Sequence, residues 1–343
     1  MAKRTPSEPR STRAPARPAP ATAPKKARGK AAPTRAPRPK LSLVVLSRKR
    51  SLYSTRRLVE AAKALGHPVK VLDTLRCDLV LESGRPRVLY EGKELPPPGV
   101  VIPRIGASVT RYGLAVVNQF EMMGVPVLNK APTIARSRDK LRCLQLLARA
   151  GIPIPRTVMM RRREDVGAAI DRVGGLPAIV KLLQGTQGVG VMIAGSKDEL
   201  ASILDTMWTL DEEILLQEFV AESKGRDIRA LVAGNRVVAA MRRVARSKGE
   251  FRSNLHRGGA GEAIRLPPAY EETAVRAARV LGLELAGVDM LESSAGPKVI
   301  EINSSPGFEG LEKATGVDVA RAILSHAAAY ARARAAGWDR VVD

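Results

Sequence analysis

Short apolar runs alternate with amphipathic stretches from residue 41 onward, a pattern typical of strands that alternate with helices. Residues 41–47 read as a buried strand, and Ser54 is a candidate N-cap of a helix that runs to Gly66. Two further apolar runs, at 69–73 and 100–103, predict a second and a third strand. This β-α-β order predicts a small doubly wound domain over residues 41–129.

A second unit is expected over residues 130–212. A helix capped by Ser137 is expected through Ala150, and the apolar run at 178–183 reads as a strand. The capping box Ser196-Lys-Asp-Glu199 then opens another helix.

A third unit is expected over residues 213–330, followed by a tail at 331–343. Its predicted elements, in chain order, are strands at 214–219, 227–233 and 236–243, a helix from Pro268 to Gly282, a hairpin, and a helix from Val317 toward Gly337. The chain shows no internal repeat. Its predicted fold class is therefore α/β, with α+β units after the first domain.

The hairpin of the third unit carries oxygen-bearing side chains on one face. A three-residue turn at Ser294-Ala295-Gly296, with glycine in the left-handed position, places Asp289 directly opposite Glu301. Asn303 shares their face. The other face is filled by Val288, Met290, Ile300 and Ile302. Two carboxylates and an amide, with no cation nearby in the sequence, suit magnesium held together with substrate phosphates. A polar hairpin that faces solvent is the alternative.

A glycine-rich loop, Gln184-Gly-Thr-Gln-Gly-Val-Gly190, follows the strand that carries Lys181. Gly185 and Gly188, with Gln187 between them, let the backbone approach phosphate oxygens. The loop is not a Walker A loop, because no Gly-Lys-Ser/Thr ends it, and an ordinary hairpin turn is the alternative. A lysine within an apolar strand is costly to bury without an anion, so we interpret Lys181 as a ligand of a nucleotide phosphate.

Two strand segments give weaker signals. Gln217-Glu-Phe-Val220 closes an apolar strand, where backbone groups could bind adenine and Glu218 a ribose; a plain strand end is the simpler explanation. Asp227 and Arg229 stand two apart on a strand and so share a face. This spacing fits either a lined cleft or a solvated sheet surface.

A basic loop at 252–259 offers further anion ligands. Arg252 and Arg257 could bind phosphates or a carboxylate in bidentate fashion, and Asn254 could orient a metal-bound phosphate. A basic surface loop is the alternative. Upstream, Arg104 could bind a substrate anion, although a bend after a strand explains its surroundings nearly as well. Together these motifs predict an ATP site that is not of the Walker type and that delivers a γ-phosphoryl group.

The formal charge of +23 is unevenly distributed. Residues 1–40 contain twelve Lys and Arg, one acid and nine prolines, so this segment carries +11 and the rest of the chain +12. With almost no large apolar side chains it is interpreted as a disordered basic arm. Such an arm could bind RNA, ribosomes or another polyanion. A solubilising tail, an overlong start and an organelle transit peptide are the alternatives.

Cysteine and histidine usage disfavours several classes. Cys77 and Cys143 form no metal or disulfide motif and fit free thiols in a reducing cytoplasm. The three histidines have no zinc spacing, and a serine or cysteine hydrolase built on a histidine base is disfavoured. No apolar run has the length of a membrane span, and no signal-peptide region opens the chain. We therefore expect a cytoplasmic protein without membrane contact.

These motifs resemble those of the ATP-grasp ligases, and within them the RimK group, over residues 41–330. The resemblance rests on Leu46-Ser-Arg48, Leu52-Tyr-Ser54, Val101-Ile-Pro-Arg-Ile-Gly106, Gln119-Phe-Glu-Met122, Ala135-Arg-Ser-Arg-Asp-Lys140, Val180-Lys-Leu182, Gly185-Thr-Gln-Gly188, Phe251-Arg-Ser-Asn-Leu-His-Arg-Gly-Gly259, Ala286-Gly-Val-Asp289 and Glu301-Ile-Asn-Ser-Ser-Pro-Gly307. The run from Phe251 and the Leu-Tyr-Ser run are the narrower signals and favour the RimK group. Ser304-Ser305 departs from the Ala-Ser that is common there.

The resemblance implies an ATP-grasp fold, with an N-terminal pre-ATP-grasp domain and two α+β subdomains that enclose ATP. It implies nucleotide contacts at Lys140, Lys181, Gly185, Gln187, Gly188, Glu218, Phe219, Asp227, Arg229, Arg252, Ser253 and Asn254. It assigns catalytic roles to Arg252, Asn254 and Arg257. Two divalent cations, magnesium or manganese, are implied at Asp289, Glu301 and Asn303.

The implied reaction adds L-glutamate to the C-terminal carboxylate of a small-subunit ribosomal protein (the sixth in the usual naming) through an acyl phosphate, with polyglutamate synthesis as a further expected activity. A homo-oligomer is expected. Three alternatives remain open. They are a sibling ligase that acts on a small-molecule or carrier-protein carboxylate, a non-catalytic ATP-binding module, and an RNA- or ribosome-binding protein whose main function lies in the basic arm.

Overall fold

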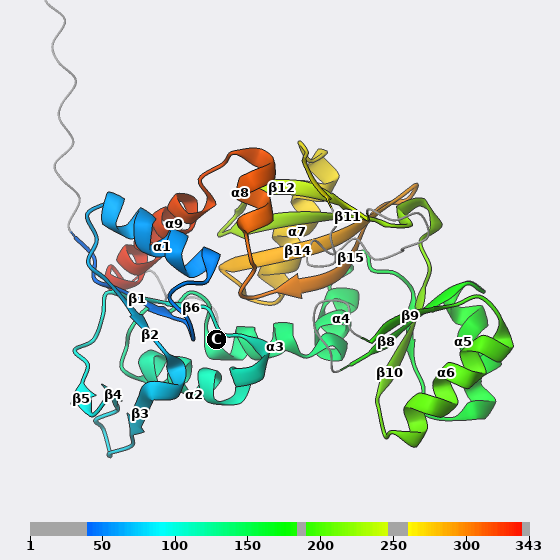
Figure 1. Cartoon of the computed structure of the whole chain (residues 1–343), viewed down its shortest axis with the longest axis horizontal. Helices are drawn as coiled ribbons and strands as arrows, with labels where there is room; N and C mark the ends of the chain where they lie inside the picture. Colours follow the sequence, from blue (N-terminus) through cyan, green and yellow to red (C-terminus); the bar gives the residue numbers. More distant parts are fainter. Residues whose placement is uncertain (1–39, 184–189, 246–259, 338–343) are drawn as a thin grey trace, which may run out of the picture. The chain divides into compact units, whose positions relative to one another are not determined.

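The computed structural model describes residues 40–183, 190–245 and 260–337, and Figure 1 labels its helices and strands. Within these ranges the strands form four sheets. The first is a parallel sheet in the order β2-β1-β6, made of β1 (Leu43–Leu46), β2 (Val69–Leu72) and β6 (Val100–Pro103). Helices α1 (Tyr53–Ala64) and α2 (Thr110–Met122) contact it. These three strands and α1 confirm the elements predicted from the apolar pattern. The predicted N-cap Ser54 was wrong, because α1 begins at Tyr53 and Leu52 occupies the cap position.

A small antiparallel sheet of β3 (Cys77–Val80), β4 (Arg87–Tyr90) and β5 (Lys93–Glu94) follows β2 in the chain. The central sheet has the order β7-β10-β8-β9, with β7 (Thr157–Met159), β8 (Ala178–Leu182), β9 (Val191–Ala194) and β10 (Ile214–Glu218). Helices α5 (Val166–Val173) and α6 (Lys197–Thr209) belong to this part. The sequence grouped β10 with the third unit, but its pairing with β7 and β8 assigns it to the central sheet.

Asp139 divides the helix expected from Ser137 to Ala150 into two, α3 (Ala131–Arg138) and α4 (Lys140–Arg149). The backbone of Asp139 is extended, and its carboxylate accepts a hydrogen bond from the backbone N–H of Arg142 at 2.9 Å. Asp139 is therefore the N-cap of α4, and the predicted cap was wrong. Ser137 instead donates to the carbonyl oxygen of Ile134 at 2.9 Å. At Ser196 the predicted cap is confirmed, since its hydroxyl accepts from the Glu199 N–H at 3.1 Å.

The largest sheet has five strands in the order β13-β12-β11-β14-β15. They are β11 (Arg226–Ala233), β12 (Arg236–Val244), β13 (Ala260–Ala263), β14 (Leu285–Ser293) and β15 (Gly296–Asn303). Helix α7 (Pro268–Val280) packs on it, and α8 (Glu309–Thr315) and α9 (Val319–Ala335) follow. Helix α9 thus extends into the segment expected to be a tail. No helix in the described ranges is both long and apolar enough to span a bilayer.

The hairpin of β14 and β15 has a different turn from the one predicted. Ser293 pairs with Gly296, so the turn contains two residues rather than three, and Gly296 lies within β15 with a φ of 101°. A bulge opposite the Asp289–Met290 step adds one residue, Ile300, to β15. The shorter turn shifts the strand register by one residue, and the bulge shifts it back.

Asp289 therefore pairs with Glu301, as the sequence predicts. Asn303 pairs with Gly287, two residues away on each strand, and lies on the same face. The prediction for the opposite face was wrong in one place. Ile300 lines a cavity, and Val299 occupies the core position expected for it.

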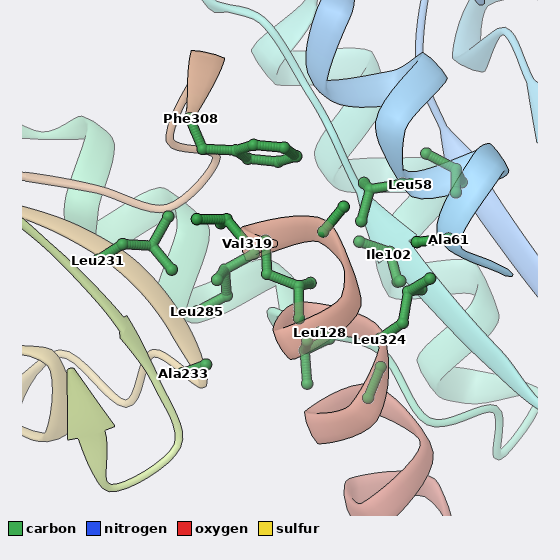
Figure 2. Packing of buried hydrophobic residues seen from close by; sticks show 14 of the residues in the cluster. Leu58, Ala61, Ile102, Leu128, Leu231, Ala233, Leu285, Phe308, Val319 and Leu324 are labelled. Atoms are coloured by element: carbon green, nitrogen blue, oxygen red, sulfur yellow. The ribbon is translucent and has the colours of Figure 1, made fainter. Parts of the chain in front are cut away.

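A single hydrophobic cluster joins the first parallel sheet to the five-stranded sheet (Figure 2). Leu58 of α1 and Ile102 of β6 are fully buried in it. Leu231 of β11, Leu324 of α9 and Phe308 before α8 belong to the same cluster. The two sheets therefore share one core. The central sheet has a separate cluster, which includes Val180, Leu200, Leu204 and Leu216.

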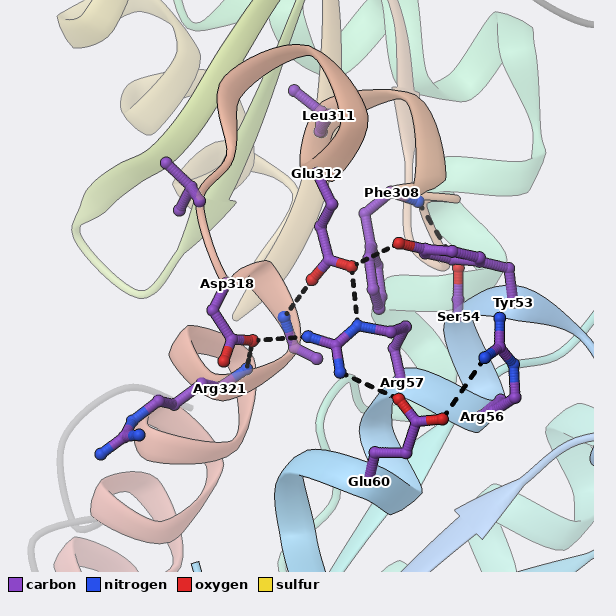
Figure 3. A network of polar contacts seen from close by, with 12 residues as sticks. Tyr53, Ser54, Arg56, Arg57, Glu60, Phe308, Leu311, Glu312, Asp318 and Arg321 are labelled. Atoms are coloured by element: carbon purple, nitrogen blue, oxygen red, sulfur yellow. Dashed lines mark hydrogen bonds and ion pairs between the residues drawn. The ribbon is translucent and has the colours of Figure 1, made fainter. Parts of the chain in front are cut away.

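Polar contacts reinforce the shared core where α1 meets α8 and α9 (Figure 3). Glu312 accepts hydrogen bonds from the hydroxyl of Tyr53 at 2.8 Å and from Nε of Arg57 at 2.9 Å. Arg57 also bonds Asp318 at 3.0 Å through Nη2, and Asp318 caps α9. The Glu312 side chain is only 8% exposed, so this ion pair is shielded from solvent.

Two matched core substitutions test whether the two cores are independent. Leu324→Ala in the shared core and Leu204→Ala in the central core should each cost about 2–5 kcal/mol, because each removes a buried side chain. Amide hydrogen exchange is measured at increasing urea concentrations. We expect Leu204→Ala to weaken protection in the central sheet, and Leu324→Ala to weaken it in the first parallel sheet and the five-stranded sheet. Equal loss of protection in all three sheets after either change would show a single cooperative core.

Candidate active site

A cavity of about 440 Å³ is lined by residues of the central sheet, of α3 and α4, and of the five-stranded sheet. Its charged and polar lining includes Arg138, Lys140, Lys181, Gln217, Glu218, Asp227, Arg243, Asp289, Glu301, Asn303, Ser304 and Ser305. This volume falls in the range of about 300–1,000 Å³ that is usual for small-molecule sites.

Four charged side chains form a buried network on the cavity side of the five-stranded sheet. Arg229 binds both carboxylate oxygens of Asp289, at 2.7 Å through Nε and 2.6 Å through Nη2. Arg243 binds both oxygens of Asp227 at 2.6 and 2.7 Å and reaches Asp289 at 3.0 Å. Asp289 is 2% exposed and Arg243 3%. Charges buried this deeply need such pairing, because the desolvation of each ion costs roughly several kcal/mol of free energy.

The two paired carboxylates of the hairpin have different electrostatic environments. Burial opposes ionisation of Asp289, but the guanidiniums of Arg229 and Arg243 outweigh it and lower the pKa of Asp289. The pKa of Glu301 is raised, because protein surrounds its carboxyl group and Asp289 is close. Solvent in the cavity still reaches the Glu301 side chain. Among the described residues no hydrogen bond or ion pair holds it, so Glu301 is available to a ligand.

Lys181 projects from β8 into the cavity and donates a hydrogen bond to Oε1 of Gln217 at 2.6 Å. Gln217 is 2% exposed, and its amide nitrogen donates to Oγ1 of Thr157 at 2.8 Å, which directs the amide oxygen to Lys181. Lys140, at the start of α4, donates to the carbonyl oxygen of Leu182 at 2.9 Å. Burial is the main reason that the pKa of Lys181 is lowered to about 8. Lys181 thus has a neutral partner where an anion would stabilise it more.

Glu218 connects the end of the central sheet to the hairpin. Its carboxylate binds Nζ of Lys298 at 2.7 Å and accepts from the backbone N–H of Arg156 at 3.0 Å. Burial opposes ionisation of Glu218, but these partners lower its pKa. Phe219 and Val220, which follow Glu218, also line the cavity.

Asn129 holds the two ends of the hairpin strands together. It is 1% exposed, and its amide nitrogen donates to the carbonyl oxygens of Leu285 at 2.7 Å and Ser304 at 2.9 Å. Its amide oxygen accepts from the backbone N–H groups of Glu284 at 2.7 Å and Leu285 at 2.9 Å. The segment directly after Asn303 is therefore fixed to the part of the chain that precedes α3.

Asp289, Glu301 and Asn303 fit a divalent cation by the chemistry of their donor atoms. Two carboxylates and an amide oxygen are hard ligands of the kind that magnesium prefers. Among the described residues the buried side-chain nitrogen of Asn303 has no hydrogen-bond partner, so no donated bond fixes the orientation of this amide. No group of three or more His, Cys, Asp or Glu side chains gathers among the described residues. A cation here would therefore depend on the amide and on substrate oxygens.

Of the predicted site residues that the structure describes, all but one line this cavity: Lys140, Lys181, Glu218, Phe219, Asp227, Asp289, Glu301 and Asn303. Arg229 reaches the network through Asp289. Gly185, Gln187, Gly188, Arg252, Ser253, Asn254 and Arg257 lie outside the described residues. Sequence reasoning missed Arg243, Gln217, Lys298 and Asn129. Arg243 had one detectable signal, since an arginine in an apolar strand predicts a buried acidic partner.

A cavity lined by two sheets, with lysines and carboxylates facing it, is typical of the ATP-grasp enzymes. The chain matches the model of the RimK-like ATP-grasp domain over residues 137–327 and that of the RimK PreATP-grasp domain over residues 41–134. The chain belongs to the RimK-like ATP-grasp family and is an ATP-dependent ligase. The predicted fold is confirmed.

Named relatives and solved structures agree with this assignment. The probable alpha-L-glutamate ligase of Marinomonas sp. is 52% identical over 286 residues, which is 83% of this chain and 95% of that protein. That of Nitrosococcus oceani is 53% identical over 284 residues, 83% and 94% of the two chains. The ATP-grasp ligase PsnB, complexed with minimal precursor, Mg and ADP, is 25% identical and superposes with a TM-score of 0.68 over 84% of this chain and 98% of its own.

The lowered pKa of Lys181 predicts a pH dependence of ATP binding. Because Lys181 loses its charge above about pH 8, ATP affinity should fall by up to about tenfold per pH unit above that value. The unfolded chain keeps this proton up to about pH 10.5, so Lys181 makes the fold more stable as pH rises between the two values, opposite to its effect on ATP. Calorimetric titration of ATP at several pH values measures the slope. Lys181→Met should bind more weakly at neutral pH and lack this slope; an unchanged slope would contradict the assignment.

Proposed function

We propose that this protein is an ATP-dependent ligase that joins L-glutamate to the C-terminal carboxylate of a small-subunit ribosomal protein. The observation that carries the proposal is the convergence of Lys140 and Lys181 with the Asp289–Glu301 pair in one cavity. The names of the relatives support glutamate as the amino acid. The acceptor is inferred from the resemblance to the RimK group. The basic segment 1–40 would favour contact with ribosomal RNA.

In this proposal ATP lies with its phosphates against Lys140 and Lys181 and its base beside Glu218–Val220. The acceptor carboxylate attacks the γ-phosphorus, so that an acyl phosphate forms and ADP leaves. The amine of glutamate then attacks the acyl carbon, an amide bond forms, phosphate leaves, and the amine proton passes to solvent. The two lysines stabilise the negative charge that develops on the transferred phosphoryl group.

Asp289, Glu301 and Asn303 would hold two divalent cations, magnesium or manganese. Bound there, the cations would neutralise charge on the phosphate oxygens. Arg229 and Arg243 keep Asp289 ionised and fix its position, since together they bind both of its oxygens.

No protein nucleophile takes part in this mechanism. Cys143 lines the cavity, but burial raises the pKa of its thiol to about 12, so it is protonated at neutral pH. A protonated thiol is a poor nucleophile. Direct transfer to the acceptor carboxylate is therefore the route that these residues support.

Intact-mass spectrometry tests the reaction and the acceptor together. The ribosomal protein is incubated with the enzyme, ATP, magnesium and glutamate. We expect a mass increase by whole glutamyl residues that requires ATP. An unmodified acceptor with ADP release would keep the ligase chemistry and reject this acceptor. An unmodified acceptor without ADP release would favour an ATP-binding module.

Glu301→Gln tests the proposed cation site without disturbing the fold, because no described side chain binds Glu301. We expect the catalytic rate to fall at least about 100-fold and the magnesium concentration needed for half-maximal rate to rise. The melting temperature should stay within about 2 °C of wild type. Normal magnesium dependence in this variant would reject Glu301 as a ligand.

A further inference from the structure

One corner of the cavity contains cationic and hydrogen-bonding groups that the proposed nucleotide and cation sites do not use. Arg138, the last residue of α3, lines this corner together with Ser304, Ser305 and the backbone of residues 105–107. The guanidinium of Arg138 donates to the carbonyl oxygen of Ile105. This bond holds the guanidinium at the wall of the cavity.

A second guanidinium, that of Arg104, lies behind the first. Its Nη2 donates to the carbonyl oxygen of Pro306 at 2.8 Å, and its carbon lies 5.8 Å from the centre of the Phe308 ring. Its Nη1 is buried and has no hydrogen-bond partner within the described ranges, and burial and the nearby Arg138 lower the pKa of Arg104 to about 10. The buried hydroxyl of Ser304 likewise has no partner among the residues that the structure describes. Neighbouring cations with unmet hydrogen bonds are costly unless an anion binds.

The protein does not supply that anion from the residues described. No ion pair joins Arg104 or Arg138 to an acid within the described ranges. Three of the acids that line the cavity, Glu218, Asp227 and Asp289, form ion pairs with Lys298, Arg243 and Arg229, respectively. The remaining acid of the lining is Glu301. Glu301 interacts with Lys140 and Lys181 as well as with Arg138, so cations remain in excess. Phosphates of ATP match the two lysines, and the two arginines are left for a different anion.

We propose that Arg138, with Ser304 and the backbone of residues 105–107, binds a carboxylate group of a substrate other than ATP, and that Arg104 is a positioning residue behind it. This inference rests on the proposed function, because such a ligase brings two carboxylate-bearing substrates into one cavity. A planar guanidinium binds a planar carboxylate through two parallel hydrogen bonds. The carboxylate belongs either to the incoming amino acid or to the acceptor terminus.

Arg138→Met tests the proposal, since it removes the charge and keeps much of the apolar side-chain volume. ATP, glutamate and acceptor peptide are varied in turn. We expect KM for one carboxylate substrate to rise about 10- to 100-fold while KM for ATP changes less than about threefold. A rise for glutamate assigns the carboxylate to the amino acid, and a rise for the peptide assigns it to the acceptor. Arg138→Lys, which keeps the charge, should recover part of the loss.

Amide analogues give a second readout that a purely structural role would not change. Glutamine and isoglutamine each replace one carboxylate of glutamate with an amide. If the site binds glutamate, the preference of wild type for glutamate over one of these amides should fall toward unity in Arg138→Met. If it binds the acceptor, this preference should be unchanged while KM for the peptide rises.

Arg142→Met is the matched control, because Arg142 is exposed one turn further along the chain on α4. It should leave every KM unchanged. A calorimetric titration distinguishes failure of the proposed function from failure of the carboxylate site. Glutamate and acceptor peptide are each titrated into the enzyme in the presence of a non-hydrolysable ATP analogue and magnesium. If wild type binds neither, the proposed function fails. Equal affinities in wild type and Arg138→Met, or a matching loss of ATP affinity, would overturn the carboxylate site.

Discussion

The burial of Asp289 in the five-stranded sheet is the constraint on which the site depends. A carboxylate that is 2% exposed stays ionised only where cations replace water. Arg229 supplies one from the adjacent strand β11, and Arg243 supplies another from β12, one strand further away. Both guanidiniums must lie within hydrogen-bond distance of Asp289, so these ion pairs require one particular register of β12, β11 and β14. Burial raises the pKa of Glu301, and the fixed charge of Asp289 across the hairpin raises it further. Sheet register and site electrostatics are therefore one property of this protein.

The order of helices and strands could be predicted, because the burial of one side of an element produces a periodic pattern of apolar residues that is visible in the local sequence. The residues that face each other across neighbouring strands could not be predicted in this way. Regular pairing from a turn at 234–235 would place Arg242 opposite Asp227, and only the bulge in β12, which adds Val238 opposite the Leu231–Val232 step, brings Arg243 there. Bulges depend on the packing of neighbouring strands, which the local sequence does not record. Asn129 reads as an ordinary loop residue, yet its amide binds backbone 156 residues away.

The walls of the cavity belong to parts with separate cores. The central sheet, which carries Lys181, has its own hydrophobic cluster. Asp289 and Glu301 lie on a sheet that contributes to two other clusters, one shared with the first parallel sheet and one with α4 and α7. The ion pair between Glu218 and Lys298 joins the two walls at the edge of the cavity. Movement of the central sheet against the hairpin would expose little core, so polar groups and bound substrates set the energy of that movement.

Helix α9 lies late in the described part of the chain but completes a core that begins with β1. Its Leu324 packs in the same cluster as Leu58 and Ile102, and Asp318 at its start binds Arg57 of α1. A chain that leaves the ribosome from its N-terminus therefore presents the first sheet with one apolar side uncovered until residues 319–335 have been added. The shared core is therefore complete only once these residues have been synthesised, so the ligase cannot reach its native fold before then.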